Sequence, residues 1–341
     1  MNGKSWAASA LLTAALSQGA TAQEVTWAFS HWVPPASEIQ LSGFVPWAES
    51  ISAASDGRIQ IEIFPAQQLG AAPDHYDMAR DGIVDISFVN PGYQAGRFPI
   101  IAAAELPFLA ANGTTASRAL HDWYMQYAEQ EMPEIKACLV HLHRPGTLHS
   151  TRGPIAGPRD FAGMNIRPPQ ATIARMISLM GASPVQVPAP EMRAILSSGG
   201  ADATVSPWDS LFLFGVDDVV THHLDMPLYG VAFVYAINKD SYAALSPENR
   251  TVIDDHCTSD WAERIATGWD RVDIVGRERI VETSGHVMYT PDETQLAEWM
   301  TLSDQLRGEW ATSAEAAGLD NAPAALEDLI TRMKAVGGAF E

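Results

Sequence analysis

The feature that most constrains the fold is a rhythm of strand and helix patterns that occurs twice along the chain. In the first run, apolar segments with a period of two residues alternate with amphipathic segments over residues 24–143. The same rhythm returns over residues 163–206. Such alternation is typical of an α/β sheet with helices on its faces. Two consecutive runs predict an α/β fold of two lobes, which agrees with the length of 341 residues.

After the second run, a strand pattern over 228–240 is expected to return to the first lobe. From Ser246, where Pro247 and Glu248 make a good helix start, the pattern is helical with few breakers and predicts one long helix. The predicted parts are a signal peptide (1–22), lobe I (23–146, completed by part of 229–341), lobe II (147–228), a long inter-lobe helix (246–284) and C-terminal helices (285–341).

The N-terminus has the form of a secretory signal peptide. Lys4 supplies the positive charge, an apolar stretch follows, and Ala20 and Ala22 form a small-x-small cleavage site. We expect cleavage after Ala22, so that the mature chain starts at Gln23. No later stretch has the length of an apolar membrane span, so we expect a soluble exported protein.

The charge balance limits the classes of partner. The formal net charge is −20 and the isoelectric point is about 4.7, so the basic footprint of a nucleic-acid-binding protein is absent. An anionic ligand would need a locally positive pocket, because the overall field repels it.

The two cysteines lie in segments of different kinds. Cys138 falls in an apolar strand-like run and Cys257 in a helical run. An exported chain could pair them, but we expect two buried free thiols. A disulfide framework is excluded by the count.

Five motifs together resemble a known family. They are, in order, "GRIQIEIFPAQQLG", "DGIVDISFVNPGY", "AELPF", "DFAGMNIRPP" and "GASPVQVPAPEMRAILSSGGADA". This ordered set is similar to the extracytoplasmic solute-binding proteins of tripartite ATP-independent periplasmic (TRAP) transporters, over nearly all of the mature chain. The resemblance implies a periplasmic, monomeric binding protein without cofactor or enzymatic activity. Two lobes, hinged by strands and braced by a long helix, would close on a small organic acid and deliver it to the membrane permease subunits.

Arg167 is the first candidate for the binding site. It ends a short apolar strand that Pro168 and Pro169 stop, and ligands of α/β folds bind at such strand ends. In the family that the chain resembles, an arginine at this position grips the ligand carboxylate, which a guanidinium matches with two parallel hydrogen bonds. A surface or structural ion pair is the alternative.

The chain departs from the family pattern in two places. Many members have a second arginine where this chain has Thr147, and Arg144 and Arg152 are near but out of register. Ser206 replaces a usual asparagine. The other expected contacts are Trp32, Asn90, Tyr93, His149, Ser206, Trp208, Tyr229 and Phe233. Core packing is the alternative for the aromatic residues, and turn chemistry is the alternative for Asn90 and Tyr93.

One arginine and several aromatic residues favour a ligand with one carboxylate and an apolar body. A hydroxy or keto monocarboxylate, branched or aromatic, is the preferred class. A zwitterion of the ectoine type comes second, because tryptophans can hold a cationic centre, and dicarboxylates and sugar acids rank lower.

Other classes of function have weaker support in the sequence. The paired histidines His141/His143 and His222/His223 lack acidic or cysteine partners at metal-ligand spacing, so no metal site is expected. A secreted hydrolase that uses Ser206 with His149 is an alternative, although no nucleophile elbow, phosphate loop or dinucleotide fingerprint is found. A binding protein that serves a sensor instead of a permease stays open.

Overall fold

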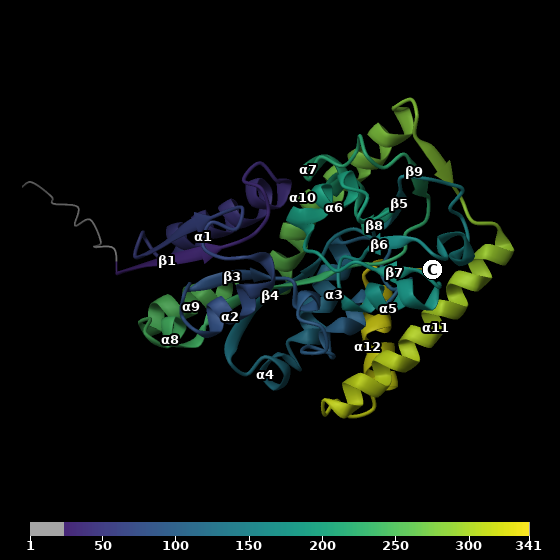
Figure 1. The fold of residues 1–341 in the computed structure, drawn as a ribbon. Coiled ribbons are helices and arrows are strands. Elements are labelled where there is room, and N and C mark those ends of the chain that lie inside the picture. Colours follow the sequence, from purple (N-terminus) through teal and green to yellow (C-terminus); the bar gives the residue numbers. More distant parts are fainter. Residues whose placement is uncertain (1–23, 341) are drawn as a thin grey trace, which may run out of the picture.

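The computed structural model describes residues 24–340, so the expected signal peptide and its cleavage site lie outside the described residues. The described strands form two sheets, one in each lobe (Figure 1). The strands are β1 Val25–Ser30, β2 Ile59–Phe64, β3 Ile86–Val89, β4 Ile135–Leu142, β5 Thr147–Ser150, β6 Asn165–Arg167, β7 Ser183–Pro184, β8 Ala203–Ser206, β9 His222–Leu224, β10 Ala232–Asn238 and β11 Val287–Tyr289.

The lobe I sheet has the order β2-β1-β3-β10-β4. Strand β1 runs parallel to β2 and β3, whereas β10 is antiparallel to both β3 and β4. All seven residues of β10 are buried, because this late strand fills the gap between two early ones. The first lobe is therefore closed by a segment that lies about a hundred residues further along the chain than β4.

The lobe II sheet has the order β11-β9-β5-β8-β6-β7. Strands β6 and β8 are parallel, and β5 is antiparallel to β8 and β9. Parallel neighbours place Arg167 at the end of β6 beside Thr204 of β8. The ends of β6 and β8 consequently reach the same edge of the sheet, which is where the two lobes meet.

Helices cover both sheets and join the lobes (Figure 1). They are α1 Val45–Ala54, α2 His75–Arg80, α3 Thr114–Tyr124, α4 Ala128–Glu131, α5 Ala171–Leu179, α6 Met192–Ser197, α7 Trp208–Leu213, α8 Lys239–Ala243, α9 Pro247–Asp255, α10 Ser259–Glu282, α11 Glu293–Ala316 and α12 Ala322–Ala335. Helix α10 packs against α3 and β4 of lobe I and against α7 of lobe II. Helix α11 contacts α5 of lobe II and the 3-10 helix Ile101–Glu105 of lobe I. Both long helices therefore brace the two lobes.

The two segments that cross between the sheets pair with each other. Gly146, before β5, and Tyr229, before β10, form an antiparallel bridge, with the Gly146 N–H 2.9 Å from the carbonyl oxygen of Tyr229. A Cβ on Gly146 would lie 2.6 Å from the carbonyl oxygen of Ser206. Only glycine allows the crossing segment to pass this close to the end of β8.

The single helix expected over residues 246–284 is wrong, because the structure has two helices there, α9 and α10. The break falls at residues 256–258, where Thr258 has an extended backbone and its side chain caps α10. The carbonyl oxygen of His256, left free at the end of α9, accepts a hydrogen bond of 2.9 Å from the Trp47 indole of α1. Outside contacts thus replace the intrahelical bonds that are lost at the break.

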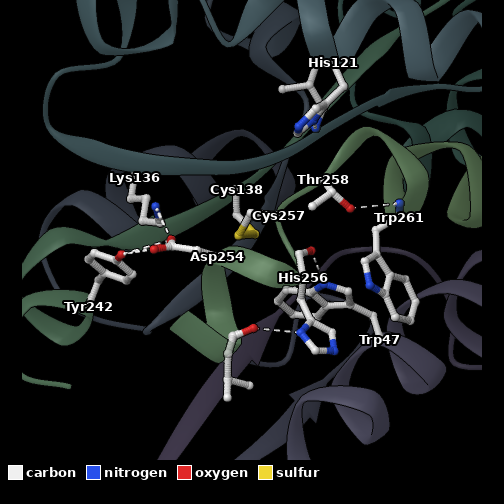
Figure 2. The surroundings of a disulfide bond; sticks show 12 residues. Trp47, His121, Lys136, Cys138, Tyr242, Asp254, His256, Cys257, Thr258 and Trp261 are labelled. Carbon is white, nitrogen blue, oxygen red and sulfur yellow. Dashed lines mark hydrogen bonds and ion pairs between the residues drawn. A yellow bond between two sulfur atoms is a disulfide. The ribbon is translucent and has the colours of Figure 1, made fainter. Parts of the chain in front are cut away.

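The expectation of two free thiols is also wrong. Cys138 of β4 and Cys257 form a disulfide, with Cα atoms 4.6 Å apart (Figure 2). Cys257 lies in the break between α9 and α10, and this break places its side chain against β4. The bond links positions 119 residues apart in the sequence, and it therefore ties the late helices to the lobe I sheet.

Candidate functional site

A cavity of about 410 Å³ lies where the two lobes meet. Seven of the nine residues proposed from the sequence line it: Trp32, Asn90, Tyr93, Arg167, Ser206, Tyr229 and Phe233. The other lining residues are Val33, His143, Pro169, Ala189, Pro207, Leu213, Phe214, Val231 and Trp269. None of the lining residues is acidic.

Arg167 lies in the wall of this cavity and is only 2% exposed. Its Nε donates to the carbonyl oxygen of Val187 at 3.0 Å, and Nη1 is 3.5 Å from that of Val205. The remaining nitrogen, Nη2, is buried and has no hydrogen-bond partner among the described residues. A buried guanidinium with an unpaired N–H is costly unless an anion completes its contacts. The geometry therefore favours a carboxylate at Nη2.

Two hydroxyl groups in the cavity wall are also without partners. Ser206, at the end of β8, and Tyr229 are both buried, and neither hydroxyl has a hydrogen-bond partner within residues 24–340. Burial raises the pKa of Tyr229 well above its usual range, although nearby Arg167 acts in the opposite direction. The phenol stays protonated and can donate. Arg167, Ser206 and Tyr229 together offer the donors that the two oxygens of a carboxylate require.

Aromatic rings form the rest of the enclosure. The Trp32 ring lies 6.2 Å from Phe233, and Phe233 lies 5.3 Å from Trp269, measured between ring centroids. Tyr93 is 5.9 Å from Trp32. The buried Trp32 indole N–H has no hydrogen-bond partner among the described residues, so lobe I also offers a free polar donor. Such walls suit a flat apolar body.

Three aromatic lining residues were not proposed from the sequence. His143 follows the end of β4, and its ring is 5.6 Å from Trp269 and 5.5 Å from Tyr229. Burial lowers the pKa of His143 to about 4, so the ring is neutral. Its position after a strand end was the only available signal. Phe214 directly follows α7 and Trp269 lies in α10, and neither helix has such a signal in its sequence.

Trp269 is held in place by a buried acidic pair. The indole Nε1 donates to Asp209 Oδ1 at 3.3 Å, and the backbone N–H of Asp209 donates to Asp273 Oδ1 at 3.1 Å. Burial raises the pKa of Asp209 to about 6 and raises that of Asp273 well above its usual range. The pair joins α10 to the start of α7, and it therefore fixes one aromatic wall.

His149 and Trp208 do not line the cavity but lie directly behind its wall. His149 Nε2 is 3.1 Å from the carbonyl oxygen of Ser206, and the Trp208 ring packs edge-on at 4.7 Å from the imidazole. Because a carbonyl oxygen only accepts, Nε2 carries the proton. His149 Nδ1, 2.9 Å from His223 Nδ1, must then accept from that ring. These two residues support Ser206 from behind.

The same contacts bear on the alternatives to a binding site. The imidazole of His149 meets the backbone of Ser206 and not its hydroxyl, so the pair is not a Ser–His dyad. The imidazole rings of His149, His223 and His286 form a chain of two hydrogen bonds, of 2.9 and 2.8 Å. Even so, no group of histidine, cysteine, aspartate or glutamate within residues 24–340 has an arrangement that could hold a metal ion.

The arginines considered as a second clamp lie elsewhere. Arg152 is an exposed residue 3.5 Å from Asp202, and Arg144 lines a different hollow with Pro145 and Arg277. Thr147, at the family position, donates to the carbonyl oxygen of Leu224 at 2.7 Å. Arg167 is therefore the one arginine among the residues that line the cavity.

Three hydrogen bonds hold the lobes together around the cavity. Asn90 Nδ2 donates to the carbonyl oxygen of Pro169 at 3.4 Å, and the Ala189 N–H donates to the Tyr93 hydroxyl at 3.0 Å. Thr172 Oγ1 donates to Glu105 Oε2 at 3.1 Å. Gly92 packs so closely on Gln170 that a Cβ would lie 2.3 Å from that side chain. The structure thus shows the closed arrangement of the lobes.

Two α/β lobes closed over a buried cavity with one arginine define a two-lobed solute-binding protein. The chain belongs to the DctP family, bacterial extracellular solute-binding protein family 7, whose sequence model matches residues 29–313. The family and its solved relatives are solute-binding proteins of TRAP transporters, which confirms the resemblance and the α/β two-lobed fold expected from the sequence. No helix in the described part of the chain is long and apolar enough to cross a membrane.

Three solved structures are similar over most of the chain. A TRAP solute-binding protein from a marine metagenome, specific for aromatic acid ligands and in complex with 3-hydroxybenzoate, is 30% identical, covers 92% of this chain and 99% of its own, and has a TM-score of 0.86. A protein from Rhodoferax ferrireducens with copurified benzoate is 29% identical (92% and 98% covered, TM-score 0.86). A protein from Bordetella bronchiseptica with bound (R)- and (S)-mandelate is 30% identical (91% and 99% covered, TM-score 0.86).

Proposed function

We propose that the protein captures an aromatic monocarboxylate in the periplasm and delivers it to a TRAP membrane permease. The observation that carries this proposal is the unpaired Nη2 of buried Arg167 in a cavity with aromatic walls and no acidic lining residue. Arg167, Ser206 and Tyr229 bind the carboxylate, and Trp32, Phe233 and Trp269 enclose the ring. The ligands of the three similar structures, 3-hydroxybenzoate, benzoate and mandelate, belong to this class.

The same features disfavour the other ligand classes. A dicarboxylate or a sugar acid would place further polar groups against aromatic walls, where they lose hydration without replacement. A zwitterion of the ectoine type would find no counter-charge among the lining residues and only ring faces for its cationic centre. The ligand that fits best therefore has one anionic end and an apolar ring.

A matched panel of ligands tests the proposal. Protein that has been unfolded and refolded to remove copurified ligand is titrated with benzoate, 3-hydroxybenzoate and mandelate, and with succinate, D-glucuronate and ectoine. Benzamide, which has the ring but no charge, is the control for the carboxylate. A ligand at a hundred times its Kd raises the free energy of unfolding by about 2.7 kcal/mol, which is readily seen as a thermal shift.

We expect shifts with the aromatic acids and none with benzamide. A shift with ectoine or succinate but not with benzoate would overturn the assignment. The periplasmic location of the protein is tested separately. N-terminal sequencing of the periplasmic fraction should find a chain that starts at Gln23. An intact Met1 in the cytoplasm would contradict the expected export.

A further inference from the structure

Glu105 is a buried carboxyl group at the seam between the lobes. It ends the 3-10 helix Ile101–Glu105 of lobe I, and its side chain is 2% exposed. Oε2 accepts a hydrogen bond of 3.1 Å from Thr172, at the start of α5 in lobe II. Oε1 is buried and has no hydrogen-bond partner among the described residues. Closure of the lobes therefore removes this carboxyl group from water and returns only one hydrogen bond.

The surroundings of Glu105 do not compensate a negative charge. The charged groups that face it are Glu131 from lobe I, which raises its pKa further, and Arg175 and Glu309, which line the same inter-lobe cavity of about 750 Å³. Arg175 is already engaged with Glu309 through two hydrogen bonds of 2.7 and 2.8 Å. Burial raises the pKa of Glu105 to about 8 in the closed arrangement. The closed lobes thus favour the neutral acid at neutral pH.

We propose that Glu105 ties closure of the two lobes to the uptake of one proton from solvent. The contacts that bury it come from both lobes, because Thr172, which donates to Oε2, belongs to lobe II, while Gly92, on which a Cβ would lie 2.9 Å from Oε1, belongs to lobe I. When lobe II moves away, the seam opens to water and Glu105 returns to an ordinary exposed carboxylate. Each cycle of closing and opening then takes up and releases a proton at this residue.

The raised pKa of Glu105 in the closed form determines how lobe closure depends on pH. A carboxyl group with a higher pKa in the closed form favours closure at low pH, and this contribution is lost as the pH rises from about 4.5 towards about 8. At pH 7, closure should take up about 0.9 proton per molecule, and at pH 8 about half a proton. Ligand affinity should therefore fall about tenfold between pH 6 and pH 7.

Calorimetric titration with 3-hydroxybenzoate at pH 7, in buffers of different ionisation enthalpy, measures this proton uptake. This calorimetric experiment rests on the proposed function, because it uses an aromatic acid as the ligand. We expect close to one proton for the wild type, and no uptake with pH-independent affinity for Glu105→Gln, which keeps the acceptor for Thr172. Glu131→Gln is the matched control: Glu131 is half-buried and also has a raised pKa of about 7, but its partners Ile100, Ile101 and Tyr124 all lie in lobe I. Its protonation should not change on closure, so proton uptake should persist.

A second arm needs no ligand. Small-angle scattering of the unliganded protein should give a smaller radius of gyration at pH 5.5 than at pH 8.5 in the wild type, and no such change in Glu105→Gln. Binding without proton uptake by the wild type, or equal uptake by Glu105→Gln, would overturn the proposal. If the aromatic acids give no heat at all, the proposed function fails. The scattering arm then decides on Glu105 alone, and a radius unaffected by pH in the wild type refutes its role.

Discussion

Replacement of Arg167 by alanine tests the carboxylate clamp directly. In the closed cavity both the guanidinium and the ligand carboxylate are desolvated, and Nη2 has no hydrogen-bond partner in the described part of the chain. Removal of one partner of such a pair typically costs about 2–5 kcal/mol. Because about 1.4 kcal/mol corresponds to a tenfold change, affinity should fall by roughly 30-fold to several thousand-fold. Arg167→Lys keeps the charge but loses the planar fork, and it should recover only part of this loss.

The structure also sets the expected effect of this change on stability. Arg167 makes one good hydrogen bond, to Val187, and a long one to Val205. A hydrogen bond to a charged group contributes about 1.5–3 kcal/mol, but alanine also removes a buried cation that has no counter-ion in the wall. The two effects oppose each other, so the unliganded protein should melt at nearly the temperature of the wild type.

The assay is calorimetric titration of both variants with the best aromatic acid, beside melting curves of the unliganded proteins. Arg152→Ala is the matched control, because Arg152 is exposed and lies outside the cavity. If Arg167→Ala binds like the wild type, the clamp is elsewhere. If the unliganded variant melts many degrees lower, Arg167 is a structural residue and the site assignment fails.

Three further changes give distinct outcomes. Tyr229→Phe removes a hydroxyl that has no hydrogen-bond partner within residues 24–340, so calorimetry should show binding weakened about 2–10-fold with an unchanged melting temperature. Equal affinity would exclude the phenol as a ligand contact. Cys138→Ala with Cys257→Ala opens a link across 119 residues and should lower the free energy of unfolding by about 2–5 kcal/mol in urea titrations, while ligand affinity stays the same; a stability equal to that of the oxidised wild type would refute the stabilising role. Burial lowers the pKa of His149 to about 3 and that of His223 to about 2, so their contribution is complete above pH 6.5 and is lost as the pH falls below it. The stability difference between the wild type and a His149→Leu/His223→Leu variant should shrink by about 1.4 kcal/mol per histidine per pH unit between pH 6 and pH 5, and a constant difference would contradict this.

Local sequence rules identified the parts of the site that lie at the ends of strands. Arg167 is followed by Pro168 and Pro169, which cannot continue a ladder, and Asn90 is followed by Pro91. In an α/β sheet these ends meet at one edge, so breaks in the sequence pattern were enough to place the residues near the ligand. Ser206, at the end of β8, was instead proposed from the family pattern, in which it replaces a usual asparagine.

The rule does not give the direction of a side chain. His149 lies on the strand next to β8, yet its ring turns behind the wall and bonds the backbone of Ser206. In a strand, successive side chains point to opposite faces, and which face borders the cavity depends on how the other lobe is placed. That placement is a property of the closed molecule and cannot be read from the strand.

By itself, the sequence determined the α/β class, the repeated rhythm that makes two lobes, and an arginine at a strand end, because these depend on short-range patterns of polarity and on proline. Only the tertiary structure decided the rest. The break at residues 256–258 looks helical in sequence and is stabilised by Trp47 from a distant helix, and this break brings Cys257 to Cys138. Trp269 and Phe214 line the cavity, and Glu105 accepts a hydrogen bond from Thr172, because segments far apart in the sequence pack side by side. The burial that sets the pKa of Glu105 and the apolar surroundings of the rings exists only after these segments have packed.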